Sequence, residues 1–163
     1  MGVRRVSVEI SAADTSWQPI IEVKARSDLF ANQLGGPIPE SQSRLGPELI
    51  FQGSQGGVSR RSAPARAGWL YKVTTTLLVE GEGPSPPAHF GPMFLDVRDN
   101  ILMHSKSVSV DNLGVEQPIV FVVTAPDAAA AVRLRLVGGW ARDINSSNLR
   151  YTYGPATLYR KIG

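Results

Sequence analysis

A short segment near the C-terminal end of the chain gathers the side chains that saccharide recognition uses. Trp140 follows a pair of glycines and precedes the charged pair Arg142 and Asp143 and the amides Asn145 and Asn148. A flat aromatic ring can pack on the C–H face of a pyranose, while the polar groups hydrogen-bond to its hydroxyls. Loops on rigid sheets often carry binding sites, so the pattern predicts a ligand-binding loop. The alternative is structural: Trp140 covers the open end of the fold and the polar residues form turns.

A second candidate is Trp17, which lies at the edge of a predicted strand after a short polar stretch. A large aromatic residue in such a place can equally anchor a loop to the core. Trp69 and Tyr71 alternate along the apolar face of a longer strand, which predicts that both belong to the core. Cross-strand aromatic packing is the simpler interpretation of the C-terminal tyrosines, which share one face by parity up to a Gly-Pro pair: Tyr151, Tyr153 and Tyr159.

The residue types that catalysis requires are sparse and poorly spaced. His89 and His104 have no partner at a ligand-like spacing, and no nucleophile-elbow, zinc-protease or phosphate-loop motif occurs. Asp96 and Asp99 could supply the two carboxylates of a glycosidase, but their spacing across a strand end and a turn fits a structural role better. We therefore predict that the chain is not an enzyme and needs no cofactor.

Metal binding has little support in the sequence. Without cysteine there is no thiolate zinc site and no disulfide framework. A calcium ion needs about six to eight oxygen ligands. A structural calcium ion stays possible but unsupported, because no cluster groups the aspartates that could contribute: Asp96, Asp111 and Asp127.

Composition and charge narrow the class of protein. The chain has 163 residues, 42% of them hydrophobic, and a formal net charge of +3, which fits one globular domain over residues 1–163 and excludes a disordered chain. Arginine pairs such as Arg60-Arg61 and Arg133 with Arg135 are spread along the sequence and offset by acidic residues, which disfavours nucleic acid as a partner. No apolar stretch is long enough for a signal peptide or a membrane helix, so we expect a soluble chain of unknown compartment that does not bind membranes.

Period-two alternation predicts an all-β fold with little helix. Residues 69–80, 6–10, 21–25 and 132–136 alternate between apolar and polar side chains, as half-buried strands do. Residues 119–123 are apolar on both faces, which predicts a central strand covered on both sides. Two polar stretches, residues 33–43 and 53–67, are expected to be long loops. With the intervening turn signals, this gives about nine or ten strands and a β-sandwich.

The order of motifs in the second half resembles jelly-roll carbohydrate-binding modules and related galactose-binding-like domains. The resemblance covers residues 68–159. It rests on an aromatic-x-Val-Thr strand at 71–74, a strand and turn at 94–100, and a Thr-Ala-Pro-x-x-Ala passage at 124–129 followed by an arginine-containing strand. It implies two antiparallel sheets that bind glycans through aromatic platforms. Asn100 stands where a turn glycine is expected, and Gly154 follows Tyr153 in place of the usual Asp, which weakens any inherited calcium or ligand site.

The resulting hypothesis is a non-catalytic glycan-recognition or accessory domain of a larger polysaccharide-handling protein. Its expected partner is a glycan or oligosaccharide. The alternative is a structural module that packs against a parent catalytic domain or against copies of itself. Exposure of both tryptophans in one concave face would favour the first, and burial of both would favour the second. The candidate ligand-binding residues are Trp140, Arg142, Asp143, Asn145, Asn148 and Trp17.

Overall fold

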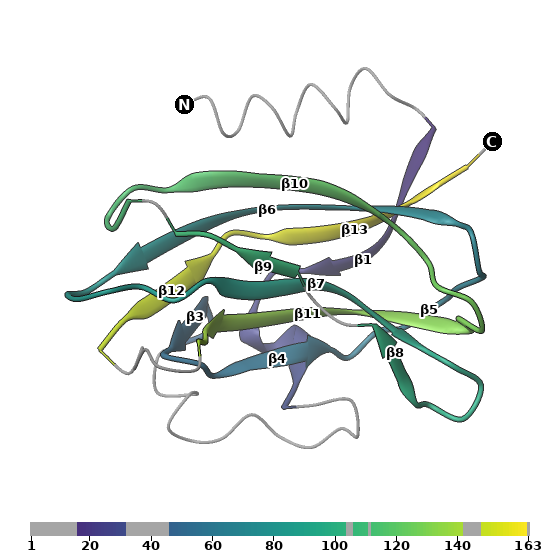
Figure 1. Cartoon of the computed structure of the whole chain (residues 1–163), viewed down its shortest axis with the longest axis horizontal. Coiled ribbons are helices and arrows are strands. Elements are labelled where there is room, and N and C mark those ends of the chain that lie inside the picture. Colours follow the sequence, from purple (N-terminus) through teal and green to yellow (C-terminus); the bar gives the residue numbers. More distant parts are fainter. Residues whose placement is uncertain (1–15, 32–45, 104–105, 111, 142–147, 163) are drawn as a thin grey trace.

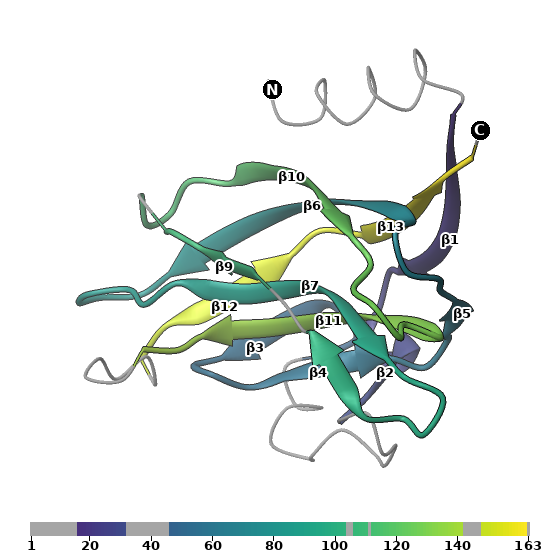
Figure 2. The ribbon, with the colours of Figure 1, turned by 45° about the vertical axis from the view of Figure 1, so that its right-hand side comes forward.

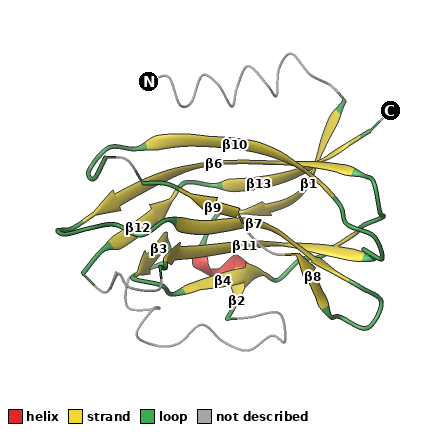
Figure 3. Ribbon diagram, viewed as in Figure 1, coloured by secondary structure: helices red, strands yellow, loops and turns green. Residues whose placement is uncertain are grey.

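Two antiparallel β-sheets face one another in the computed structural model and enclose an apolar core (Figure 1). The structure describes residues 16–31, 46–103, 106–110, 112–141 and 148–162. Within these ranges it has 13 strands and one short 3-10 helix, Arg26–Asp28 (Figure 3). The predicted all-β sandwich with little helix is therefore confirmed. None of the helical structure in these ranges is long and apolar enough to cross a membrane.

The first sheet, sheet A, is organised around its longest strand, β6. Strand β10 pairs with one edge of β6, while β12 and β13 pair with successive parts of the other edge. Beyond these lie β3, which pairs with β12, and β1, which pairs with β13. The strands of sheet A are β1 (Trp17–Val23), β3 (Leu49–Gln52), β6 (Leu70–Glu80), β10 (Gln117–Thr124), β12 (Arg150–Tyr153) and β13 (Ala156–Lys161).

The second sheet, sheet B, has β7 and β11 at its centre, and Figure 2 shows them running side by side. Strands β4 and β5 pair with the far edge of β11, and β2 pairs with β4. Strands β8 and β9 pair with the opposite edge of β7. The strands of sheet B are β2 (Leu29–Phe30), β4 (Gly56–Ser59), β5 (Ala63–Pro64), β7 (Ala88–Leu95), β8 (Ile101–Met103), β9 (Lys106–Val108) and β11 (Ala131–Gly139).

The core forms where the apolar faces of both sheets meet. In β11 the inward residues Val132, Leu134 and Leu136 are fully buried, as the alternation predicts. Tyr151 and Tyr153 also point inward and donate hydroxyl hydrogen bonds to the Pro86 carbonyl (3.1 Å) and the Val137 carbonyl (2.5 Å). These bonds satisfy the polar ends of two buried rings and tie β12 of sheet A to sheet B.

The aromatic residues assigned to the core divide between the two faces of sheet A. Tyr71 is fully buried, and its ring meets that of Phe94 edge to face. Trp69 is only half-buried at the margin of the core, with the Arg160 guanidinium 4.3 Å from its ring centroid. Tyr159 follows the break after β12, and its ring lies on the outer side of the sheet.

Three other sequence expectations need correction, and two fall outside the described residues. The strand predicted at 119–123 is β10, but it lies at the edge of sheet A and leaves Val122 46% exposed. Apolar residues on both faces therefore did not mean cover on both faces. The stretch 53–67 is not one loop, because it contains β4 and β5. These short strands also raise the count above nine or ten. The predicted strand at 6–10 and the whole of the predicted loop at 33–43 lie outside the described residues.

Candidate functional site

Trp140 is the most exposed aromatic side chain that the sequence selected. It directly follows the last residue of β11, and 59% of its surface is open to solvent. Its backbone N–H donates to the Pro87 carbonyl at 3.1 Å, which fixes the chain at the point where the indole leaves the sheet. An exposed ring on a held backbone has the form of a stacking platform, since little conformational entropy is lost when a ligand covers it.

His89 contacts the backbone carbonyl of Trp140. Its Nε2 lies 3.0 Å from the Trp140 carbonyl oxygen, and because a carbonyl only accepts, Nε2 carries the proton. In that tautomer Nδ1 accepts from the Ser107 hydroxyl at 3.3 Å. The imidazole and indole centroids are 6.3 Å apart, with the rings tilted by 59°. His89 is thus a positioning contact for Trp140 and has no catalytic partner among the described residues.

Asn148 lies at the same end of the sandwich. Gly53 bonds to the residues before Trp140 and after Asn148, at the two ends of the predicted ligand-binding loop. Its carbonyl accepts from the Gly139 N–H at 3.0 Å, and its N–H donates to the Leu149 carbonyl at 2.9 Å. Asn148 lines a hollow of about 430 Å³ together with Gln52, Glu80, Gly81 and Arg150. Arg142, Asp143 and Asn145 lie outside the described residues.

Trp17 lies in the other sheet. Its half-buried ring in β1 is covered by the Lys72 ammonium at 4.7 Å and the Lys161 ammonium at 5.5 Å from the ring centroid. The Lys72 ammonium also lies 4.7 Å from the Tyr159 centroid, and the whole Lys72 side chain is only 2% exposed. Trp17 and Trp140 therefore do not share a face, and the structure separates two residues that the sequence placed in one candidate set.

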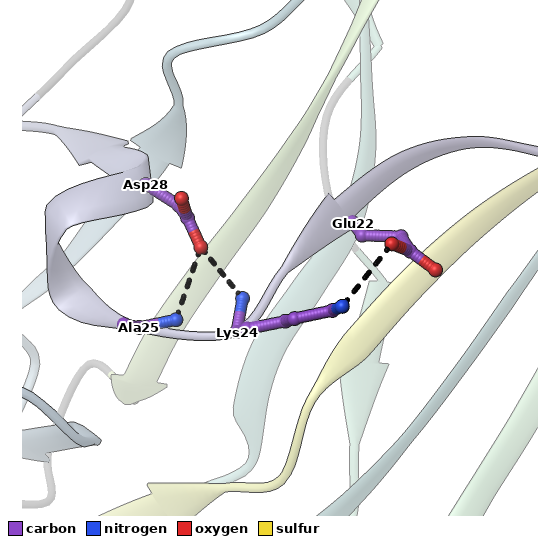
Figure 4. A network of polar contacts seen from close by, with 4 residues as sticks. All are labelled: Glu22, Lys24, Ala25 and Asp28. Carbon is purple, nitrogen blue, oxygen red and sulfur yellow. Dashed lines mark hydrogen bonds and ion pairs between the residues drawn. The ribbon is translucent and has the colours of Figure 1, made fainter.

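A second polar hollow, of about 420 Å³, flanks the end of β1 and has no aromatic wall. Its charged groups are engaged locally (Figure 4). The Asp28 carboxylate accepts from the backbone N–H groups of Lys24 (2.8 Å) and Ala25 (3.1 Å), and the Lys24 ammonium pairs with Glu22 at 3.6 Å. These contacts order the turn into the 3-10 helix. The hollow offers no aromatic ring on which a sugar could stack.

Asp96 and Asp99, the two aspartates considered for catalysis, lie in the turn between β7 and β8. The Asp96 carboxylate accepts from the backbone N–H groups of Arg98 and Asn100 and from the Asn100 side chain, at 2.8 to 3.0 Å. The hydrogen bonds from Asn100 lower the pKa of Asp96. Asp99 is the turn residue itself, with a φ of 64°. No group of three or more potential metal ligands occurs within the described ranges, while His104 and Asp111 lie outside them.

Comparison with known proteins identifies the fold. The chain is similar to a Clostridium thermocellum endo-1,4-beta-D-xylanase 10B, whose CBM22-1 and GH10 modules were crystallised with xylohexaose. The similarity has a TM-score of 0.50 and 17% identity, and covers 90% of this chain and 26% of that one. The sequence resemblance to jelly-roll modules is confirmed at the level of the fold. The chain spans about a quarter of the xylanase chain.

Two further structures are similar at lower scores. One is the CBM22-1 xylan-binding domain of a Paenibacillus barcinonensis protein, with a TM-score of 0.41, 12% identity, and coverage of 91% of this chain and 87% of that one. The other is a structure of infectious bursal disease virus, with a TM-score of 0.46, 12% identity, and coverage of 92% and 35%. No protein-family model matches the sequence, and no curated protein matches it.

The sequence analysis missed the neighbours that complete the hollow at Asn148. Gln52, Arg150 and Glu80 form one row across three strands, because Arg150 pairs with Gln52 on β3 and with Glu80 on β6. The three residues come from segments up to 98 positions apart in the numbering (52 to 150), so no local motif could reveal them. Strand parity could have placed each on an outer face, but not next to the others.

Proposed function

We propose that this chain binds a saccharide through Trp140, as a non-catalytic domain of a larger polysaccharide-handling protein. The observation that carries the proposal is the 59% exposed indole at the end of β11, held by Pro87 and His89. An exposed indole presents a flat apolar face with a polar N–H at its edge, and tryptophan is enriched at binding surfaces for this reason. The hollow at Asn148 supplies an amide, a carboxylate and a guanidinium for hydroxyl groups at the same end of the fold.

The structural comparison suggests the first ligand to test. The xylanase that shares the fold was crystallised with xylohexaose, so xylo-oligosaccharides come before other neutral glycans. The non-catalytic role is inferred from the carboxylate of Asp96, which is engaged in its own turn. We also propose that residues 1–163 form a single domain, because β1 near one end and β13 near the other are paired strands of one sheet.

The test is affinity electrophoresis of the full chain in gels that contain neutral polysaccharides, beginning with xylan. Retardation of the native chain and its loss in Trp140→Ala, with an unchanged thermal unfolding midpoint, would support the proposal. Trp17→Ala is the matched control, because it removes a tryptophan from the other sheet. Equal retardation of the native chain and Trp140→Ala, or no retardation in any glycan, would overturn it.

A second candidate function, assembly with other copies of the chain, has one observation in its favour. Within the described residues β10 pairs only with β6, and none of its eight residues is charged. A long uncharged edge strand with an exposed Val122 can pair with another strand. Sedimentation should then give a dimer that Val122→Lys converts to monomer, whereas a native monomer at high concentration would reject this function.

A further inference from the structure

Two arginines that are distant in the sequence share one aromatic ring on the outer side of sheet B. The Arg60 guanidinium carbon lies 4.5 Å from the centroid of Phe30, and that of Arg133 lies 6.0 Å from the same centroid. The two guanidinium carbons are therefore at most 10.5 Å apart, the sum of these distances. We call Phe30, Arg60 and Arg133 the arginine patch.

The strand register explains why these residues meet. Val132 and Leu134 of β11 point into the core, so Arg133 between them points outward, beside Met93 of β7. Arg60 follows the end of β4, which pairs with β11 on its other edge. Phe30 enters from β2, the strand beyond β4. The patch therefore lies across three neighbouring strands of one sheet face.

Arg133 is held firmly in this position. Its Nη1 donates to the backbone carbonyls of Ser59 and Arg60, both at 2.8 Å, and the Phe30 ring packs near its guanidinium. Arginine presents five donors, so two bonds from one nitrogen leave the other donors for a ligand. Arg60 is exposed and stacks on the same ring, which orients its guanidinium at little entropic cost.

The positive charge of the patch is not neutralised by a described carboxylate. Among the residues that the structure describes, the ion pair joins Lys24 and Glu22, and neither belongs to the arginine patch. Two guanidinium groups this close repel one another, and an anion between them would remove that cost. Bidentate guanidinium groups are the preferred protein partners of carboxylate and sulfate.

We propose that the outer face of sheet B binds an anionic saccharide whose carboxylate or sulfate groups contact Arg60 and Arg133. The inference rests on the proposed function, because Trp140 lies at the end of the same strand that carries Arg133. Trp140 lies seven positions beyond Arg133, which at about 3.3 Å per residue is roughly 23 Å along β11. Val58 and Met93, which flank β11 on this face, are only 3% and 1% exposed, so a saccharide of several units would contact the chain at the two ends, with a ring on the indole and an acidic group on the patch.

The chemistry of the patch favours a saccharide over a nucleic acid. Phe30 already has two guanidinium groups near its ring, which compete with a base for stacking on it. The formal net charge of +3 is also small for a protein that binds a phosphate backbone. An acidic saccharide needs positive charge only where its acidic groups lie, and the guanidinium groups of Arg60 and Arg133 supply it.

The test compares three probes on the full chain: polygalacturonate for carboxylate, heparin for sulfate and xylan as the less charged control. We expect tighter binding to at least one anionic probe at low salt, and about a tenfold weakening in Arg60→Gln, the scale of one charge-assisted hydrogen bond. Arg98→Gln is the matched control, since Arg98 is exposed in the turn before β8 and loses the same charge. High salt should reduce the difference between Arg60→Gln and the native chain.

A second variant changes Arg133, the half-buried arginine of the patch. Arg133→Lys keeps the charge but cannot make the planar two-pronged contact, so it should weaken anionic binding while urea unfolding shows a retained fold. Equal losses in Arg60→Gln and Arg98→Gln would overturn the inference, as would tighter binding of the native chain to single-stranded DNA than to either anionic saccharide. Xylan binding that depends on Trp140 but not on Arg60 would reject the anionic ligand and leave the proposed function standing. Failure of both anionic probes would also reject the anionic ligand, whereas the proposed function is rejected when no glycan binds.

Discussion

Trp17 and Trp140 are the same residue type in one chain, but their surroundings give them opposite roles. The Trp17 ring is half-buried on sheet A under the ammonium groups of Lys72 and Lys161. The Trp140 ring is 59% exposed at the end of sheet B, and the contacts that fix it are made mainly by its backbone. The protein covers the face of one indole and leaves most of the other open to solvent.

The difference teaches that the neighbours of an aromatic residue, more than its place at a strand edge, determine its role. Trp17 pairs with Lys161 and lies two residue pairs from the pair that contains Tyr159, and the ammonium groups of Lys161 and Lys72 reach its ring. Trp140 directly follows the last pair of β11 with β7, Gly139 with Ala88, and no strand among the described residues pairs with it. A side chain beyond the last pair of a strand is supported by the backbone without being covered.

The largest effect should come from Gly139→Ala, which disturbs the backbone beneath Trp140. A Cβ at this position would collide with the Tyr151 hydroxyl and approach the Pro86 carbonyl to 2.9 Å. We expect a loss of about 3 kcal/mol in unfolding free energy, the upper part of the usual range for overpacking, measured by urea denaturation. Saccharide binding should fall as well. Gly83→Ala, at an open turn glycine with φ of 99°, gives for comparison the cost of backbone strain without a steric clash; a loss in Gly139→Ala below about 1 kcal/mol would contradict the steric account.

Alkaline pH should lower the stability of the fold through the buried hydroxyls of Tyr151 and Tyr153. Burial raises the pKa of Tyr151 to about 12 and that of Tyr153 well above its usual value. Their stabilising effect is complete below about pH 10, where both states keep the proton, and is lost as the pH rises through the folded value because only the unfolded chain ionises readily. We expect the urea midpoint to fall between about pH 10 and 12. Tyr151→Phe should lessen that fall, and an identical pH profile in this variant would contradict the assignment.

Trp17→Ala should be a stability variant with normal ligand binding. It removes a ring that is stacked with two cations, contacts worth about 0.5 to 2 kcal/mol together with the lost packing. We expect a loss of about 2 kcal/mol in urea denaturation. Loss of saccharide binding by folded Trp17→Ala would contradict the expectation that Trp17 only stabilises the fold.

The smallest effects concern the turn that follows β1, and they separate two kinds of polar contact. Asp28→Ala removes the acceptor of two backbone N–H bonds and should cost about 1 kcal/mol. Glu22→Gln removes a carboxylate from an exposed ion pair and should change stability by less than about 0.5 kcal/mol. Thermal unfolding of the two variants measures both, and a larger effect for Glu22→Gln would reverse this ranking.

Much of the fold could be predicted because alternation is a local property. The inward residues of β6 and β11 are buried as expected. The position of β10 could not be predicted. A strand with two apolar faces can lie at the centre of a sheet or at its edge, and the choice depends on which strands are left to pair with it.

The candidate site was only partly predictable for the same reason. The sequence identifies Trp140 and Asn148 as residues of one segment, but the sheet that carries Trp17 depends on pairing across the whole chain. Arg60 and Arg133 meet at Phe30 although 73 positions separate the two arginines. In the sequence they are two members of scattered arginine pairs, and only the register of β4 against β11 brings them together.

The most direct test of the account is tryptophan fluorescence during a saccharide titration of two single variants. Trp17→Phe retains Trp140, and Trp140→Phe retains Trp17, while Trp69 is present in both. We expect the emission of Trp17→Phe to shift on saturation as in the native chain, and that of Trp140→Phe to stay constant. A shift that persists in Trp140→Phe and disappears in Trp17→Phe would contradict the central claim, because it would place the ligand on sheet A.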